Sequence, residues 1–334
     1  MNHVVAAAST LVASIPSPSS GEISIGPLDL RAYGLMIALG VIAAVWLLGR
    51  RLAEKGLGDA DDASSIAIWA VAAGIIGSRL YHVATEWPKF RDDLESIPKI
   101  WEGGLGIPGG LLAGVAVGLW RANRRGIAPM ATLTCAAPAL PLAQAIGRWG
   151  NWFNQELYGR PTDLPWALEI DDAHNLDYPT GTTFHPTFLY ESIWNLGLCG
   201  VLLWIDRRFR LGPGRLFACY LIGYGAGRFW IEALRIDPTE ASDVLGLRWN
   251  QWVALAAVVA GVIWLWRTKG QKWPERPVEP PVDGGDTVAG GEDDVDGGQE
   301  PDDHDLDDGA ESDGDVREST VGNLPGDPRA PTHR

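Results

Sequence analysis

Seven long apolar segments between residues 32 and 266 set the strongest limit on how this chain can fold. A helix needs roughly 20 mainly apolar residues to cross the hydrocarbon layer of a bilayer, and most of these segments approach that length. They predict an all-α, polytopic membrane protein with about seven transmembrane helices and a lipid bilayer around them. The segments lie near 32–49, 65–83, 107–120, 131–147, 188–205, 214–232 and 250–266.

The third segment differs from the others at its start, where WEGGLGIPGG (101–110) supplies several Gly and a Pro. We expect a re-entrant or broken entry to the membrane at this point. Irregular backbone at membrane depth is tolerated only where protein or water covers it.

The acidic character of the chain belongs to its C-terminal end. The formal net charge is −15, and residues 274–334 contain 19 acidic and 4 basic side chains. Subtracting these from the 42 acidic and 27 basic residues of the whole chain leaves 23 of each in residues 1–273. The tail has almost no large apolar side chains, so it cannot bury enough surface to offset its chain entropy. We therefore predict a disordered acidic tail over 274–334.

Basic residues are divided unevenly between the two sets of connectors. The connectors after the odd-numbered segments hold 14 Lys and Arg, and the opposite side holds 7. Because Lys and Arg accumulate on the cytoplasmic side of membrane proteins, the N-terminus is expected outside and the tail in the cytoplasm. The chain then divides into an outer-facing segment (1–30), a transmembrane body (31–273) with an outer-facing connector (148–187), and the cytoplasmic tail. Connectors of this length are usually functional.

Three arginines lie in or at the outer ends of apolar segments: Arg79 in GSRLYHV, Arg148 in GRWGN and Arg228 in GRFWIEALR. An arginine at the centre of a membrane helix costs about 2.5–3.5 kcal/mol on insertion scales. Such a side chain either extends to the interface or binds an anion. Glu232 lies four residues after Arg228, on the same helix face. That pair is either an internal ion pair or an arginine held toward a phosphate, which the rigid guanidinium fork suits.

The stretch GRWGNWFNQELYGR (147–160) places a dense polar cluster at the outer edge of the membrane. Asn151 and Asn154 can both donate and accept hydrogen bonds, and Glu156 can orient an arginine or act as a base. Further along, His185 can titrate near neutral pH, or simply cap the helix that it precedes. Tyr33 lies at the outer mouth of the first segment. At this edge the available anion is a phospholipid headgroup.

This stretch closely resembles the signature sequence of the prolipoprotein diacylglyceryl transferases. The resemblance extends, in order, over most of residues 22–267 through ISIGPLDLRAYGLM, GSRLYHV, WEGGLGIPGG, the signature itself, HPTFLYES and GYGAGRFWIEALR. It implies a multi-pass enzyme of the bacterial cell membrane. The implied reaction, the first step of lipoprotein maturation, moves the diacylglyceryl group of phosphatidylglycerol to the lipobox cysteine of a preprolipoprotein. A thioether forms and glycerol phosphate leaves.

The resemblance also implies the site residues. Arg148, Arg228, Glu156 and His185 are expected to be catalytic. A second set is expected to bind phosphatidylglycerol: Arg148, Asn151, Gly159, Tyr33, Arg228 and Glu232. The family needs no metal or soluble cofactor, and the chain has no metal or nucleotide motif. The expected partners are the lipid and the signal peptide of the preprolipoprotein, and no nucleic acid.

One residue departs from the family pattern. Many members have a His where this chain has Pro108 in GLGIPGG, and that His has been proposed as the base. Proline cannot accept a proton, so Glu156 and His185 remain as candidates. Free cysteine has a pKa of about 8.5, and arginines near the thiol would lower it without a dedicated base. The alternative function is a non-enzymatic membrane transporter or binding protein for an anionic solute, which arginines within the membrane would also suit.

Overall fold

The computed structural model describes residues 14–25, 28–237 and 245–273, so the predicted acidic tail lies outside the described residues. Within them the chain is mostly helical. The long helices are α1 (Ala32–Glu54), α2 (Ala60–Thr85), α4 (Ile107–Arg124), α5 (Pro129–Ala136), α6 (Ala139–Phe153), α7 (Thr187–Phe209), α8 (Arg215–Glu232) and α9 (Trp249–Arg267).

Local sequence sets several of the helix boundaries. After α1 the chain turns at Gly56, whose φ of +63° is a conformation that glycine adopts without strain. The Asp59 side chain then caps α2, in a capping box with Asp62. Pro138 stands between α5 and α6, where the helical direction changes by 45°. The predicted fourth span is therefore a bent pair of helices instead of one straight helix.

Each of the seven predicted apolar segments is helical, but they differ in how well they suit a membrane. By length and composition, α1, α2, α7 and α9 can each cross a bilayer, and the bent α5–α6 pair would be a fifth span. The two 18-residue helices α4 and α8 fall short of this standard. Arg121 and Arg124 lie in α4, and α8 contains Arg215, Arg228 and Glu232. The described residues thus form a polytopic membrane protein with four or five candidate spans.

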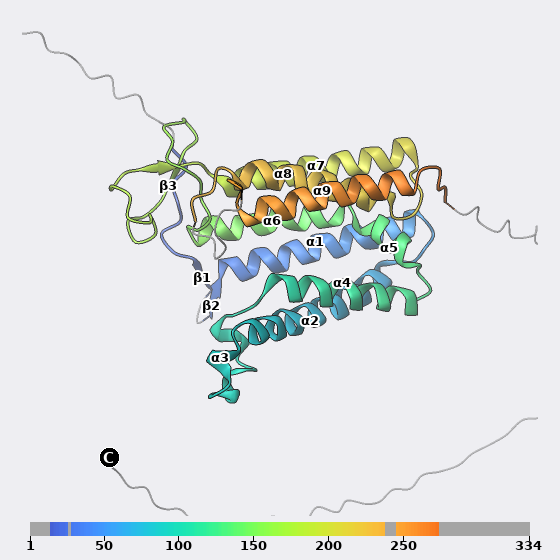
Figure 1. The fold of residues 1–334 in the computed structure, drawn as a ribbon, viewed down its shortest axis with the longest axis horizontal. Coiled ribbons are helices and arrows are strands. Elements are labelled where there is room, and N and C mark those ends of the chain that lie inside the picture. Colours follow the sequence, from blue (N-terminus) through green and yellow to red (C-terminus); the bar gives the residue numbers. More distant parts are fainter. Residues whose placement is uncertain (1–13, 26–27, 238–244, 274–334) are drawn as a thin grey trace, which may run out of the picture. The chain divides into compact units, whose positions relative to one another are not determined.

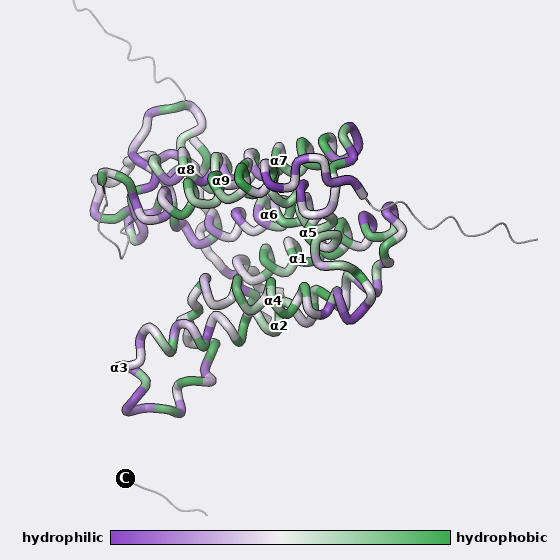
Figure 2. The backbone as a smooth tube through the Cα atoms, turned by 45° about the vertical axis from the view of Figure 1, so that its right-hand side comes forward, coloured by the Kyte–Doolittle hydropathy of each residue, from purple (hydrophilic) through white to green (hydrophobic). Residues whose placement is uncertain are grey.

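The helices form two groups that meet at α1 (Figure 1). On one side α1 packs on α6, and α6, α7, α8 and α9 then contact one another in sequence order. On the other side α1 contacts α2, which packs along α4. Gly77 and Gly109 make this close approach possible, because a Cβ on Gly109 would lie 2.3 Å from the Gly77 carbonyl oxygen. Figure 2 shows hydrophobic colouring along the helices and hydrophilic colouring toward their ends.

A buried ion-pair cluster joins three helices at the end of the bundle where α1 finishes. Asp206 of α7 accepts from Arg51 at 3.0 Å and lies 2.9 Å from Lys55. Arg51 is 3% exposed and also donates to the Cys135 carbonyl of α5 at 3.1 Å. Two residues of the predicted cytoplasmic basic set therefore hold α1, α5 and α7 together.

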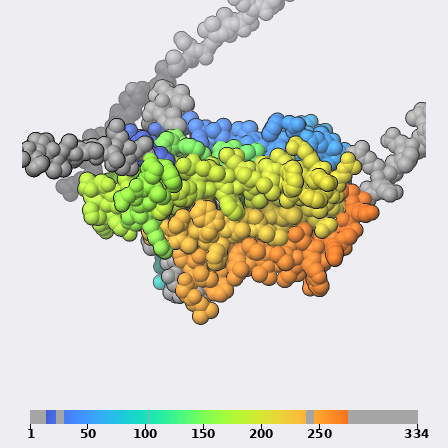
Figure 3. Space-filling model, turned by 90° about the horizontal axis from the view of Figure 1, so that it is seen from above, coloured from blue at the N-terminus to red at the C-terminus, as the bar shows by residue number. Residues whose placement is uncertain are grey.

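The opposite end of the bundle contains short β-structure, so the predicted all-α fold needs a correction. Strands β1 (Glu22–Ile25) and β2 (Leu28–Arg31) pair antiparallel just before α1, and β3 (Leu168–Glu169) pairs with β4 (Thr183–Phe184) in the connector. These backbone groups have no helical partners, and pairing between strands satisfies them. Figure 3 shows the connector, in yellow-green, extending past the helix ends.

The connector begins later than the sequence suggested. Helix α6 continues through the polar stretch to Phe153, so Arg148 and Asn151 lie on a helix and not in a loop. Polar side chains here face other protein groups, and they therefore do not mark the end of the helix. After α6 the backbone reverses at Gln155 and Leu157, which have φ of +51° and +59°.

The entry to α4 is irregular, as predicted. Helix α3 (Trp87–Phe90) and two 3-10 turns (Leu94–Ser96 and Ile100–Glu102) precede it. Arg79 of α2 holds this segment. Its guanidinium donates to the backbone carbonyls of Ile97, Gly103, Gly104 and Ser96 at 2.6–3.1 Å. Arg79 is therefore neither a snorkelling side chain nor a free anion site.

Candidate active site

Two arginines on different helices share one buried carboxylate at the end of the bundle that carries the connector. Glu191 of α7 forms an ion pair with Nε of Arg148 at 2.7 Å and with Nη1 of Arg228 at 3.1 Å. Its side chain is 5% exposed, whereas those of Arg148 and Arg228 are 22% and 15% exposed. The carboxylate therefore sets the spacing of α6, α7 and α8 at this level and leaves the two guanidinium groups partly open.

Glu232 forms a second and deeper centre. It is fully buried and contacts Arg228 at 2.7 Å, Arg248 at 3.3 Å and Arg235 at 3.7 Å. Asn250 of α9 also donates to it at 3.0 Å. Arg228 is thus held from two sides, by Glu191 and by Glu232. The internal ion pair considered from the sequence exists, and it fixes the direction of Arg228.

We call this set the arginine cluster: four guanidinium groups (Arg148, Arg228, Arg235, Arg248) and three carboxylates (Glu191, Glu232, Asp237) linked by ion pairs. One positive charge is in excess. In its two outer arginines, Nη2 of Arg148 and Nε of Arg228 make neither a hydrogen bond nor the closest ion-pair contact with the described residues. The cluster can therefore offer directed N–H donors to an anion, although most of its charge is already balanced.

A second branch runs from Arg148 to Glu156. Nη1 of Arg148 donates to Asn151 at 3.3 Å, and Asn151 donates to Oε1 of Glu156 at 2.8 Å. Tyr33 of α1 lies against this branch. A Cβ on Gly150 would approach its ring to 2.7 Å, and its hydroxyl is close enough to Glu156 and Arg148 to interact with both electrostatically. The predicted residues on α1, α6 and α8 therefore meet in one place.

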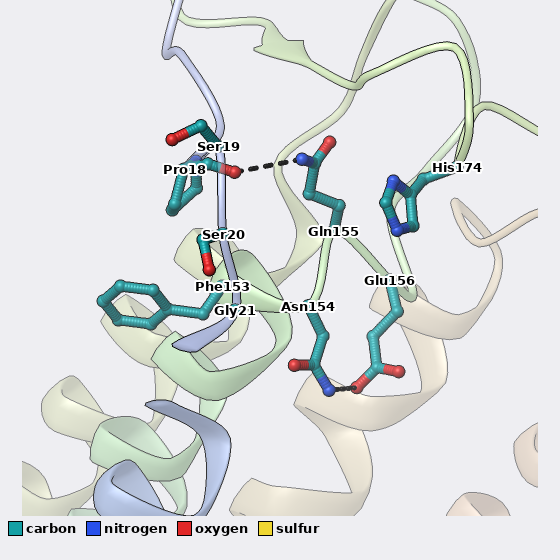
Figure 4. Close-up of a pocket in the computed structure, with 9 residues that line it drawn as sticks. All are labelled: Pro18, Ser19, Ser20, Gly21, Phe153, Asn154, Gln155, Glu156 and His174. Atoms are coloured by element: carbon teal, nitrogen blue, oxygen red, sulfur yellow. Dashed lines mark hydrogen bonds between the residues drawn. The ribbon is translucent and has the colours of Figure 1, made fainter. Parts of the chain in front are cut away.

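Glu156 also lines a polar cavity of about 300 Å³, shown in Figure 4, which we call the N-terminal pocket. Its floor comes from the end of α6, and its wall comes from the segment that leads into β1. Gln155 holds the two together, because it donates to the Pro18 carbonyl at 3.1 Å. Asn154 donates to Oε1 of Glu156 at 3.3 Å. The lining residues are Pro18, Ser19, Ser20, Gly21, Phe153, Asn154, Gln155, Glu156 and His174.

Two predicted site residues lie in a different cluster. Nδ1 of His185 is 3.1 Å from the Tyr190 hydroxyl, and Gly159 donates its backbone N–H to the His185 carbonyl at 2.9 Å. A Cβ on Gly159 would lie 2.8 Å from that of His185, so glycine is needed for packing. Burial lowers the pKa of His185 below its ordinary value. Gly159 pairs with Arg235 of the arginine cluster in an isolated antiparallel β-bridge, whereas no hydrogen bond or ion pair among the described residues joins the His185 side chain to that cluster.

Sequence reasoning missed the most central residue. Glu191 was seen only as a neighbour of His185 in HPTFLYES, although an acidic residue inside an apolar helix is itself a functional signal. Arg248 and Asn250, at the start of α9, carry no such signal, and neither do residues 18–21 and His174 of the N-terminal pocket, whereas Asn154 and Glu156 were indicated by the polar stretch. Among the described residues, no three His, Cys, Asp or Glu side chains are grouped so that they could hold a metal ion.

The part of the chain that forms the helices and the arginine cluster is similar to known proteins. Residues 21–267 match the family described as prolipoprotein diacylglyceryl transferase. The phosphatidylglycerol–prolipoprotein diacylglyceryl transferase of Streptomyces griseus is 51% identical over 76% of this chain and 77% of its own length. The enzyme of the same name from Frankia alni is 51% identical over 81% of this chain and 70% of its own. Phosphatidylglycerol–prolipoprotein diacylglyceryl transferase 1 of Streptomyces coelicolor is 49% identical over 84% of this chain and 80% of its own length.

The residues that match the family run through every helix from α1 to α9, and all seven residues of the arginine cluster lie within this range. The matches do not favour the transporter alternative, because the matched family is one of transferases. The chain is therefore a multi-pass membrane transferase that belongs to the prolipoprotein diacylglyceryl transferase family.

Proposed function

We propose that this chain transfers the diacylglyceryl group of phosphatidylglycerol to the lipobox cysteine of a preprolipoprotein, and that the arginine cluster binds the lipid phosphate. The observation that carries the proposal for the site is the shared carboxylate. Glu191 holds Arg148 and Arg228 together while Nη2 of one and Nε of the other have no hydrogen-bond partner among the described residues. A phosphodiester has two non-bridging oxygens that can accept from these donors.

The reaction can be balanced atom by atom. The thiolate sulfur attacks the diacylglycerol carbon that carries the phosphate, a C–S bond forms and the C–O bond breaks. The electron pair of the broken bond stays on the phosphate oxygen, and the phosphodiester monoanion leaves as a monoester dianion. Arg148 and Arg228 stabilise the charge that grows there. Fixed donors of this kind often supply the largest single contribution to catalysis.

The thiol proton needs an acceptor, and Glu156 is better placed for it than His185. Oε1 of Glu156 accepts from Asn151 and Asn154, whereas Oε2 makes no hydrogen bond to the described residues. Glu156 belongs to the Arg148 branch, and His185 belongs to the Tyr190 cluster. Tyr33, Asn151 and Glu232 orient the lipid-binding groups, and Gly159 acts through packing. Since the cluster has little excess charge, its directed donors matter more than its overall potential.

Purified chain in detergent micelles with phosphatidylglycerol and a lipobox peptide tests the function. We expect the peptide mass to rise by one diacylglyceryl group, and we expect no change for a control peptide with Ser in place of the lipobox Cys. An anion transporter would modify neither peptide. Loss of transfer in Arg148→Ala and Arg228→Ala, with normal insertion and folding, would link the function to this site.

For the membrane arrangement we propose seven spans, with α4 and α8 crossing the bilayer despite their charges. Each of them packs along a helix long enough to span: α4 on α2, with an exposed apolar face that includes Leu111 and Leu112, and α8 on α9. Arg228 and Glu232 of α8 pair with protein groups instead of facing lipid, which removes most of the penalty for a charge in the membrane, and Arg215 lies at the first residue of the helix. The arginine cluster, the connector and residues 1–30 then lie outside, and the tail 274–334 lies in the cytoplasm.

A further inference from the structure

We propose that the N-terminal pocket binds the terminal glycerol of the phosphatidylglycerol headgroup and so selects this lipid among phospholipids. The inference rests on the proposed function, and it assigns a part of the substrate to a cavity outside the arginine cluster. The pocket has a volume of about 300 Å³, which exceeds the size of a glycerol group.

Position is the first argument. The pocket is separated from Arg148 by two hydrogen bonds, Arg148 to Asn151 at 3.3 Å and Asn151 to Glu156 at 2.8 Å. In phosphatidylglycerol, the terminal hydroxyl lies four bonds beyond the phosphate oxygen, a reach of roughly 5 Å at about 1.5 Å per bond. A phosphate bound to Arg148 can therefore extend its glycerol along this branch toward Glu156, which lines the pocket.

The chemistry of the lining is the second argument. The only formal charge among the lining residues is the Glu156 carboxylate, so the pocket disfavours a second phosphate and accepts hydroxyl donors. Ser19, Ser20 and Asn154 add groups that both donate and accept, and Figure 4 shows the His174 ring on the side of Glu156 away from Ser20. Vicinal hydroxyls, each a donor and an acceptor, match this arrangement.

The frame of the pocket is built independently of its lining. Gln155 is 5% exposed, and its side-chain amide nitrogen donates to the Pro18 carbonyl and to the Asp171 carboxylate. Its side-chain oxygen accepts from the Asp171 backbone N–H. The exposed side chains of Ser20 and His174 take no part in this frame: among the described residues, the Ser20 hydroxyl bonds only to the Glu22 backbone, two residues further on, and the His174 ring makes no hydrogen bond. Substituting them should change the lining without opening the frame.

The test compares phosphatidylglycerol with phosphatidylethanol, which keeps the phosphodiester charge but carries an ethyl group in place of glycerol. The measured quantity is the ratio of kcat/KM for the two lipids, in micelles of defined lipid fraction with a fixed lipobox peptide. One hydrogen bond is worth roughly a three- to tenfold change in affinity. We expect the combined Ser20→Ala and His174→Ala substitutions to lower the ratio about tenfold or more, mainly through KM for phosphatidylglycerol.

Thr182→Ala is the matched control, because it removes a hydroxyl from the same outer region at a residue that does not line the pocket. It should keep the wild-type ratio. An unchanged ratio in the Ser20/His174 double variant would overturn the proposal. So would a double variant in which the lipid ratio holds while KM rises for peptides extended beyond the lipobox cysteine, since the pocket would then bind the polypeptide substrate.

A second measurement does not require transfer. The thiol introduced by Ser20→Cys should react with a maleimide more slowly when the micelles contain phosphatidylglycerol than when they contain phosphatidylethanol. The thiol introduced by Thr182→Cys should react equally in both. Absence of transfer with selective protection at position 20 would refute the proposed function alone, whereas transfer without selective protection would refute the pocket assignment alone.

Discussion

Nε of Arg148 on α6 and Oε2 of Glu191 on α7 form an ion pair at 2.7 Å, and the other oxygen of Glu191 holds Arg228. This relationship turns two arginines, either of which could have extended to the membrane interface, into one fixed unit. Removing one member of a buried ion pair leaves an uncompensated charge, which usually costs more than the pair contributes. Predictions about this unit therefore concern geometry as well as charge.

Arg148→Lys is expected to lose most of the activity that Arg148→Ala loses. Arginine uses Nε for Glu191 and Nη1 for Asn151, which leaves Nη2 for the lipid. A lysine nitrogen cannot serve these three directions at once. Initial rates of peptide lipidation measure the loss, and Arg160→Lys, an exposed arginine of the connector, provides the control. A fully active Arg148→Lys enzyme would mean that charge alone is sufficient.

Glu191→Gln should lower both activity and stability. The substitution keeps the side-chain shape but leaves Arg148 and Arg228 without their shared anion. We expect a loss of stability of about 3–5 kcal/mol, the usual range when one partner of a buried pair is removed, and a large loss of transfer.

Thermal unfolding in detergent and the lipidation rate measure these two effects. Glu86→Gln is the matched control, because its pair with Lys89 is exposed and screened by solvent and should contribute little to stability. Equal behaviour of the Glu191 and Glu86 variants would remove the shared carboxylate from the mechanism.

The proposed orientation predicts which introduced cysteines can be labelled from outside intact cells. Ala173→Cys lies on the exposed part of the connector, and Asn123→Cys lies at the exposed end of α4 at the opposite end of the bundle. An impermeant maleimide should label the first and not the second. The native Cys135 and Cys199 are buried, and Cys219, which is only partly buried, is replaced by Ser in both labelling variants to keep the background low. Labelling of Asn123→Cys alone would invert the topology.

The acidic tail should be dispensable for transfer, because the proposed orientation puts the site outside and the tail in the cytoplasm. The chain should be ended after Trp273, whose ring lies 4.9 Å from the Lys55 ammonium and belongs to the described fold. We expect this truncated chain to insert and to transfer lipid at close to the full rate. A truncated chain that reaches the membrane normally but transfers poorly would give the tail a role in catalysis.

The sequence predicted where the helices lie better than where they end. It also indicated Arg148 and Arg228 of the arginine cluster but not Glu191, the carboxylate that joins them. Apolar runs identify α1, α2, α7 and α9, because a helix that crosses the hydrocarbon layer needs a long, mainly apolar sequence. The extension of α6 to Phe153 could not be read from polarity, because Arg148 and Asn151 are satisfied by partners on other segments. Glu191 was missed for the same reason: its importance comes from contacts between helices, which no local pattern records.

The loops gave less information than the helices. The alternation needed to recognise strands is absent from two-residue pairs such as β3 and β4, so an all-α fold was expected. Arg79 was correctly seen as unusual, but its four carbonyl partners lie in a Gly-rich segment whose path depends on Arg79 itself. Such mutual dependence can be recognised only in three dimensions.

Pro108 offers the last prediction, because it stands where the resemblance to the family implies a His. It lies in the first turn of α4, a position that proline tolerates since its missing N–H would have no helical partner. That turn is anchored to α2, where Gly106 donates to the Ser78 carbonyl at 2.9 Å. Pro108→Ala should therefore fold and keep measurable transfer. Pro108→His should give no large gain, because Glu156 is already the proposed acceptor of the thiol proton.

The rate of transfer against pH, at saturating lipid, tests whether the thiol is activated by Glu156 and the arginine cluster or needs a base at position 108. The pKa of His185 is lowered by burial, so its neutral form is complete above the ordinary value of about 6.5. Any stability that depends on neutral His185 is present above that value and is lost as the pH falls through the lower folded value. The wild-type rate should thus show no His185 step between pH 7 and 8. A base introduced by Pro108→His would add a new dependence near pH 6.5 and a many-fold higher rate. That result would refute the assignment of thiol activation to the arginine cluster and Glu156, whereas profiles that overlay would support it.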